Sequence, residues 1–176
     1  MIKVNVNFDS LAFQRQLNKL RRDVVPKVMA RALNRAADGV KAEAVRTISQ
    51  LTSLKQSEIR KRMFVSGATP HKLWAEVGAL PYAPNLRTFR ATRNKAGIAA
   101  TAWGVRKTYR GGFTTPKGTV VSRVGKQRGP LKPLHGPSLP NTFMREIVLR
   151  KLEAVARRRW RSEAERELAR RLASGR

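Results

Sequence analysis

A chain of 176 residues is long enough for one domain, and 38 Lys and Arg against 11 Asp and Glu give it a formal net charge of +27, which indicates a polyanionic or acidic partner. The absence of cysteine excludes disulfides and thiolate zinc sites. No apolar run approaches the roughly 18 residues of a membrane span, and the N-terminus lacks the apolar block of a signal peptide, so we expect a soluble, cytoplasmic protein without membrane contact.

The first 52 residues are predicted to form a strand followed by helices. Alternating apolar residues from Ile2 to Phe8 are typical of a strand, and Asp9 or Ser10 can cap a helix with a sparse apolar stripe up to residue 24. Pro26 suits the first turn of a new helix. The strongest helical signal of the chain follows, where small apolar residues recur at near-helical spacing: Val28, Ala32, Ala36, Val40, Ala44, Ile48 and Leu51.

The helical pattern ends near residue 63 and gives way to strands. Before that point, Ser53 and Gln56 have the spacing of a capping box, which predicts a short helix over residues 54–62. Three alternating segments then predict an antiparallel sheet: residues 71–79 with Leu73, Ala75 and Val77 on one face, residues 99–109 with Trp103, Val105 and Tyr109 at alternate positions, and residues 119–124.

One long helix is predicted over residues 142–172. Its apolar side comprises Phe143, Ile147, Val155 or Ala156, Trp160, Ala164 and Leu168. The far end is mostly charged, so we expect it either to fray in solvent or to pack on another subunit. The fold class is therefore α+β, with long N-terminal and C-terminal helices packed on a central antiparallel sheet. Residues 1–140 form the core, with a Pro-rich arm over about 125–140, and residues 141–176 form the basic helix of the same domain.

The sequence offers little for catalysis. From Val77 to Arg145 there is no Asp or Glu, against 13 Lys or Arg, so the sheet supplies no carboxylate for acid–base chemistry or metal binding. His71 and His135 lie in Pro-flanked loops, and no G-x-S-x-G motif supports a Ser–His pair. Four glutamates of the last helix lie among arginines, the usual pattern of an exposed helix: Glu153, Glu163, Glu165 and Glu167. We predict no enzymatic activity, no metal and no cofactor.

A stretch rich in proline and glycine, residues 125–140, precedes the last helix. Its glycines do not match a P-loop, because no G-K-[ST] follows, and a flexible linker would be rich in Gly and Ser. Four prolines stiffen it toward extended conformations, with leucines between them. We expect Leu131 and Leu134 to bury against another element of the same chain or of a neighbouring subunit.

Basic residues are spread along the whole chain, and no helix-turn-helix, zinc-finger or RNA-binding signature is present. Such a diffuse field suits a protein that lies near DNA or beside acidic protein without reading base sequence. The alternative is a merely well-solvated surface. The residues expected to contact DNA or an acidic partner lie on the last helix and on the loops of the sheet: Arg106, Lys107, Arg110, Arg157, Arg158, Arg161 and Arg170.

Two blocks of the sequence resemble the minor tail protein Z family of lambda-like siphophages, whose members are also called tail completion proteins. The first block is VVPKVMARALNRAADGVKAEAVRTISQLTSLKQSEIRKRM, from Val24 to Met63. The second is GFTTPKGTVVSRVGKQRGPLKPLHGPSLPNTF, from Gly112 to Phe143, a strand and arm that precede a long basic helix. Together they cover about two fifths of the chain in the order found in the family.

The resemblance implies a non-enzymatic virion protein, made in the host cytoplasm, at the head-proximal end of a long phage tail and needed for head–tail joining. Related neck proteins form rings, commonly hexamers, of α+β subunits. Its expected partners are further copies of itself, tail terminator, head–tail connector and tube or tape measure proteins, and genomic DNA through sequence-independent contact. The family motifs mark these positions as interfacial: Arg128, Gly129, Pro130, Leu131, His135, Gly136 and Pro137. Leu134 joins them as a buried residue of the arm.

Two other function classes remain open at this stage. A non-specific nucleic-acid-binding protein would explain the charge, and a basic nuclease would need acidic metal ligands from the helices. The mass of the protein in solution distinguishes a ring from a monomeric or dimeric binder. An assay with and without magnesium tests the nuclease.

Overall fold

The structure is a computed structural model that describes residues 2–3 and 24–173 of the chain. The α+β prediction is confirmed, with long helices at both ends of the described region and antiparallel strands between them. The predicted strand beyond Lys3 and the predicted helix before Val24 lie outside the described residues. Four α-helices and one 3-10 helix are described: α2 (Val24–Thr52), α3 (Gln56–Arg62), η1 (Leu86–Phe89), α4 (Leu139–Phe143) and α5 (Glu146–Ala173).

The described strands form three antiparallel sheets of three strands each, rather than one central sheet. The first has the order β1–β3–β2, with β1 (Ile2–Lys3), β2 (Met63–Ser66) and β3 (Glu76–Ala79). The second is β4–β5–β6, with β4 (Thr92–Asn94), β5 (Gly97–Ala102) and β6 (Val105–Arg110). The third is β7–β8–β9, with β7 (Gly112–Thr114), β8 (Val120–Arg123) and β9 (Leu131–Pro133).

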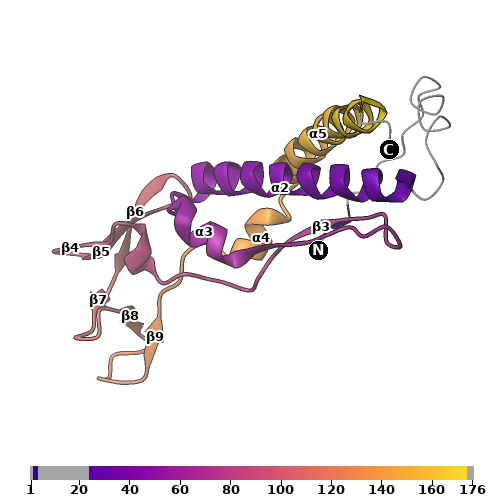
Figure 1. The fold of residues 1–176 in the computed structure, drawn as a ribbon. Coiled ribbons are helices and arrows are strands. Elements are labelled where there is room, and N and C mark those ends of the chain that lie inside the picture. Colours follow the sequence, from indigo (N-terminus) through magenta and orange to yellow (C-terminus); the bar gives the residue numbers. More distant parts are fainter. Residues whose placement is uncertain (1, 4–23, 174–176) are drawn as a thin grey trace. The chain divides into compact units, whose positions relative to one another are not determined.

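The chain divides into two compact units, each made of separate stretches of sequence. Unit 1 comprises residues 1–44, 63–79 and 146–176, and unit 2 comprises residues 45–62 and 80–145. The helix α2 (Figure 1) contributes residues to both units. Each unit is described separately below.

In unit 1, α2 and α5 pack through small apolar residues. The predicted stripe on α2 is buried from Val28 to Ile48, and Leu51 is partly buried. One cluster of the core joins both helices: Val28, Ala32, Ala36, Trp160, Ala164 and Leu168. Ala32 and Ala36 on α2 and Ala164 on α5 allow close approach of the helix axes, because they add almost no side-chain width. The described far end of α5 packs on α2 of its own chain through Trp160, Ala164 and Leu168.

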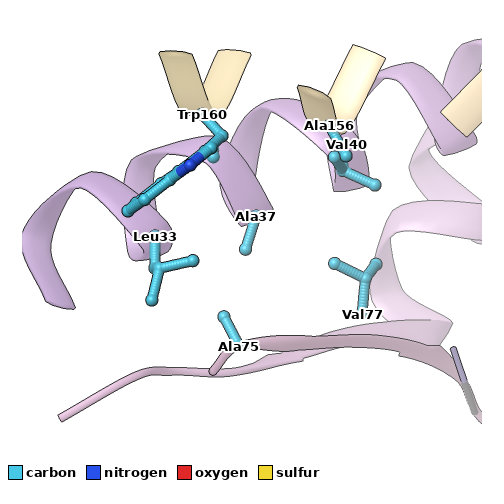
Figure 2. Close-up of a pocket in the computed structure, with 8 residues that line it drawn as sticks. Leu33, Ala37, Val40, Ala75, Val77, Ala156 and Trp160 are labelled. Carbon is cyan, nitrogen blue, oxygen red and sulfur yellow. The ribbon is translucent and has the colours of Figure 1, made fainter. Parts of the chain in front are cut away.

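A small apolar cleft of about 20 Å³ lies between α2, α5 and the strand segment that contains β3 (Figure 2). Ala75 and Val77 point from that segment toward Ala37 and Val40 of α2, and Trp160 of α5 completes the lining. A second link between α2 and the sheet region is polar. Asn34 donates to the carbonyl of Ala68 over 3.0 Å and accepts from its N–H over 2.6 Å.

In unit 2, the two remaining sheets are antiparallel meanders of three consecutive strands each. The hairpin β5–β6 pairs Ala102 with Val105, so its turn consists of two residues, Trp103 and Gly104. Both have positive φ, 58° and 71°, as a type I′ turn requires. The prediction that Trp103 lies within a strand is therefore wrong, although the residues on both sides are in strands. Buried Leu86, Phe89, Ile98 and Val120 contribute to the core of this unit.

The boundaries of the predicted helices need two corrections. Ser53 has φ 60° and donates its N–H to the Ser49 carbonyl, so it ends α2 in a left-handed cap and does not begin α3, which starts at Gln56. The single helix predicted over residues 142–172 is two helices, because a turn at Met144 and Arg145 separates α4 from α5. This break changes the helical phase, so Val148 and Leu152 are buried and Ile147 is exposed.

Candidate interaction surfaces

The Pro-rich arm is held by its own chain. Its strand β9 pairs with β8, with Val121 opposite Pro133 and Arg123 opposite Leu131. After β9, residues 134–139 run beside residues 82–86. Three backbone hydrogen bonds hold them there: Leu86 N–H to Leu134 O over 2.9 Å, Gly136 N–H to Pro84 O over 2.8 Å and Leu139 N–H to Tyr82 O over 2.8 Å. The arm is thus a structural part of unit 2.

The side chain of Asn85 joins the arm to the segments beside it through hydrogen bonds. Its side-chain amide donates to the carbonyls of Val120 and Leu134, both over 2.9 Å, and its Oδ1 accepts from the Val120 N–H over 2.9 Å. Oδ1 also accepts from Arg87 N–H over 3.2 Å, at the start of η1. One side chain therefore satisfies backbone groups of three segments. Sequence reasoning missed Asn85, because its partners lie 35 and 49 residues away along the chain.

The predicted interface residues fall into two groups. Pro137 is buried, and Gly136 lies so close to the ring of Phe89 that an added Cβ would be 2.1 Å from Phe89 Cε2. Leu134 is partly buried against Gly112, and the His135 ring bonds through Nδ1 to the Ala83 carbonyl over 2.9 Å. His135 nevertheless remains exposed, and the other exposed members form the loop before β9 and its first residue: Arg128, Gly129, Pro130 and Leu131. These four form a continuous exposed segment of the arm that a partner can reach.

The basic residues predicted to meet DNA or an acidic partner differ in their surroundings. Arg106, Lys107 and Arg110 are exposed on β6. On α5, Arg157 and Arg158 are exposed, but Arg161 forms an ion pair with Glu165 over 3.1 Å and Arg170 forms one with Glu167 over 3.1 Å. Two of the four helical candidates are thus already neutralised within the helix.

Unit 2 also contains an open groove lined by cations, here called the basic groove. It is lined by Arg93, Arg110, Gly111, Phe113, Thr114, Ser122, Arg123, Gly125 and Lys126. The guanidinium of Arg123 lies over the Phe113 ring, 5.6 Å from its centroid. Of these residues only Arg110 was singled out from the sequence. The others were missed because strand pairing gathers them from three separate stretches, although the acid-free region that contains them was visible.

Two carboxylates of α5 that were expected on an exposed face are buried. Glu167 has no exposed surface and Glu163 is only 8% exposed. Arg35 of α2 reaches Glu167 over 2.6 Å and Glu163 over 3.7 Å. The prediction of an exposed helix with ordinary pairs is wrong for these two residues. Their spacing from Trp160 places them beside the apolar stripe, a signal that the surrounding arginines concealed.

The described residues contain no group of three or more His, Cys, Asp or Glu suited to hold a metal ion. His71 belongs to unit 1 and His135 to unit 2. In the part of the chain that the structure describes, no helix has the length and apolar character needed to cross a bilayer.

A family model described as prophage minor tail protein Z (GPZ) matches residues 12–174 of the chain. This match confirms the resemblance found in the two sequence blocks and extends it over the residues between them. No curated protein and no solved structure matches the chain.

Proposed function

Since the chain belongs to the prophage minor tail protein Z family, we propose that it is a tail completion protein at the head-proximal end of a phage tail, needed for head–tail joining. Membership of the family gives it a structural role in the tail and a place in the virion. The observation that carries the proposal is the match over residues 12–174, which includes the arm, the basic groove and both long helices.

We further propose that the chain acts as a ring, with a hexamer favoured, and that it contacts tail terminator, connector and tube or tape measure proteins. The exposed part of the arm, Arg128 to Leu131, supports this because Leu131 keeps 45% of its surface in solvent on a backbone held by strand pairing. A rigid apolar side chain loses little conformational entropy when a partner covers it. Synthesis in the host cytoplasm belongs to the same proposal.

The test is a phage in which the gene is disrupted and the chain is supplied in trans. Without the chain we expect full heads and unattached tails in electron micrographs, and few infectious particles. With it, joined particles should return, and a labelled copy should appear at the head-proximal end of the tail. Normal numbers of joined, infectious particles without the chain would refute the proposed role.

We propose that no step of this action is chemical. No Asp or Glu occurs between Val77 and Arg145, and the chain has no thiol. Changing His71 and His135 together to Gln should therefore leave the yield of infectious phage near the wild-type value. Loss of infectivity by the double variant, with its fold and mass in solution unchanged, would instead indicate a catalytic role for a histidine.

The alternative function, non-specific nucleic-acid binding without a role in assembly, is favoured by the charge of unit 2. It predicts joined particles in the absence of the chain, and a monomer or dimer by mass measurement in the presence of tails.

A further inference from the structure

The basic groove gathers four cations from separate elements of unit 2. Arg93 comes from β4, Arg110 from β6, Arg123 from β8 and Lys126 from the loop that follows β8. β5 pairs with both strands that carry these arginines: Arg93 of β4 lies opposite Ile98, and Arg110 of β6 lies opposite Gly97. Two arginines 17 positions apart in sequence are thus carried by the two strands that flank β5.

Within the described parts of the chain, no acidic side chain neutralises these cations. Among the described residues, none of the four forms a salt bridge, and no Asp or Glu occurs between Val77 and Arg145 to provide one. On α5 the opposite holds, since Arg150, Arg161, Arg166 and Arg170 each pair with a glutamate. The groove therefore presents bare positive charge to solvent, whereas much of the charge on α5 is balanced.

The charge of the whole chain follows the same division. Unit 2 has 84 residues with 18 Lys or Arg and one Glu, which gives a formal charge of +17. Unit 1 has 92 residues with 20 Lys or Arg and 10 Asp or Glu, which gives +10. A concave surface lined by one sign of charge focuses the field and raises the local concentration of a polyanion.

We propose that the basic groove binds the phosphate backbone of duplex DNA without regard to base sequence. Guanidinium groups bind phosphate oxygens in bidentate fashion, and the hydroxyls of Thr114 and Ser122 can donate further hydrogen bonds to them. The lining contains no Asn or Gln, the side chains that read adenine, and in this proposal its arginines contact phosphate oxygens rather than guanine edges.

An acidic protein fits the groove less well. Protein interfaces are anchored by large apolar or aromatic side chains in their centre. The one aromatic residue in the lining, Phe113, is partly buried and lies beneath the guanidinium of Arg123. The DNA assignment rests on the proposed place at the head-proximal end of the tail, where the polyanion at hand is the duplex genome.

The experiment measures the affinity of the full chain for two labelled duplexes of unrelated sequence over a series of salt concentrations. The groove variant carries Arg93→Gln, Arg110→Gln, Arg123→Gln and Lys126→Gln. The matched control carries Lys27→Gln, Arg31→Gln, Arg150→Gln and Arg159→Gln, which removes the same charge from exposed positions of unit 1 that were not predicted to contact DNA. Circular dichroism and thermal unfolding verify that both variants are folded.

We expect the unchanged chain to bind both duplexes equally and to lose affinity steeply with salt. The groove variant should bind at least about tenfold more weakly near 100 mM salt, with a salt slope reduced by about 0.9 for each lost phosphate contact. The control should lose much less. Equal losses in the two variants, a clear preference for one duplex, or a groove variant that binds normally would each overturn the proposal.

Poly-glutamate serves as the protein-like competitor. If it binds as tightly as DNA and also depends on the four groove cations, the partner is an acidic protein and the DNA assignment is wrong. The assay needs no phage particle, so its failure would leave the role in tail completion intact, whereas failure of the gene-disruption test would leave the binding result intact.

Discussion

At the scale of single residues, the side chain of Asn85 forms more hydrogen bonds than any other side chain that contacts the arm in the described structure. We expect Asn85→Ala to lower the free energy of unfolding by about 2 kcal/mol, because it leaves the N–H of Val120 and a carbonyl lone pair of Leu134 without partners. Urea titration followed by circular dichroism measures the change. Asn141→Ala is the control, since Asn141 is exposed on α4, and its effect should stay within about 0.5 kcal/mol. Equal effects of both variants would contradict the role given to Asn85.

The buried carboxylate of Glu167 gives a second prediction at this scale. Glu167→Gln keeps the volume of the side chain but removes the charge that Arg35 and Arg170 face. Removing one partner of a buried ion pair costs several kcal/mol, and because Arg35 is 44% exposed we expect about 3 kcal/mol.

Glu165→Gln provides the comparison two residues away on the same helix. Glu165 is 55% exposed and pairs with Arg161, so its loss should cost less than about 1 kcal/mol. Thermal or guanidinium unfolding measures the loss of stability in each of the two variants. If Glu165→Gln is as destabilising as Glu167→Gln, burial is not what makes Glu167 important.

Both residues show where sequence reasoning reaches its limit. Glu167 is surrounded by arginines in the sequence, so its local pattern is that of an exposed helix, and only the packing of α5 against α2 buries it. Asn85 precedes a short 3-10 helix, and its cap of that helix is a local interaction. The hydrogen bonds that hold the arm, however, join its side chain to the distant residues Val120 and Leu134. Long-range polar partners leave no periodic signal.

At the scale of elements, the exposed end of β9 can be tested separately from its buried part. We expect Leu131→Ser to preserve folding and to reduce the number of joined phage particles severalfold, because the side chain is half exposed in the free chain. Plaque counts and electron microscopy after complementation measure the effect, and circular dichroism verifies the fold.

Two further variants make that result interpretable. Val105→Ser removes an apolar residue of β6 that is more exposed than Leu131 and should leave particle numbers unchanged. Leu134→Ser should instead destabilise unit 2, because Leu134 is packed against Gly112. Normal assembly with Leu131→Ser would mean that the arm serves only the fold of its own chain.

The elements themselves were largely predictable, for identifiable reasons. A four-residue repeat of mostly small apolar residues predicts α2, and a short run rich in Val predicts β8, since both signals are local. The turn at Trp103 was not predictable in this way, because a bulky residue rarely adopts positive φ. The break before α5 was missed because Thr142 to Ile147 continues a helical pattern, while the change from unit 2 to unit 1 at Glu146 depends on tertiary packing.

At the scale of the whole molecule, the concentration of charge in unit 2 predicts salt-dependent stability. With +17 on 84 residues, repulsion opposes the compact state, and salt near 0.1 M shortens the screening length to about 10 Å. We expect the midpoint of thermal unfolding to rise by a few degrees between about 20 and 200 mM NaCl. Differential scanning calorimetry measures the midpoint.

The groove variant with four neutralised cations should show a smaller rise over the same range, because part of the repulsion is already removed. A midpoint that falls with salt would show that attractive pairs such as Arg35 with Glu167 dominate the balance instead. An unchanged rise in the groove variant would show that the four groove cations are not the source of the repulsion.

The division into discontinuous units also has a consequence for how the chain folds as it leaves the ribosome. All of unit 2 has been synthesised once Arg145 is complete, so its hairpins can close early. Unit 1 must wait for α5, which follows every other described element, and until then the apolar face of α2 from Val28 to Ala36 has no Trp160, Ala164 or Leu168 to cover it. The nascent chain therefore exposes this apolar face until α5 has left the ribosome, and like-charge repulsion between neighbouring nascent chains opposes their aggregation during that interval.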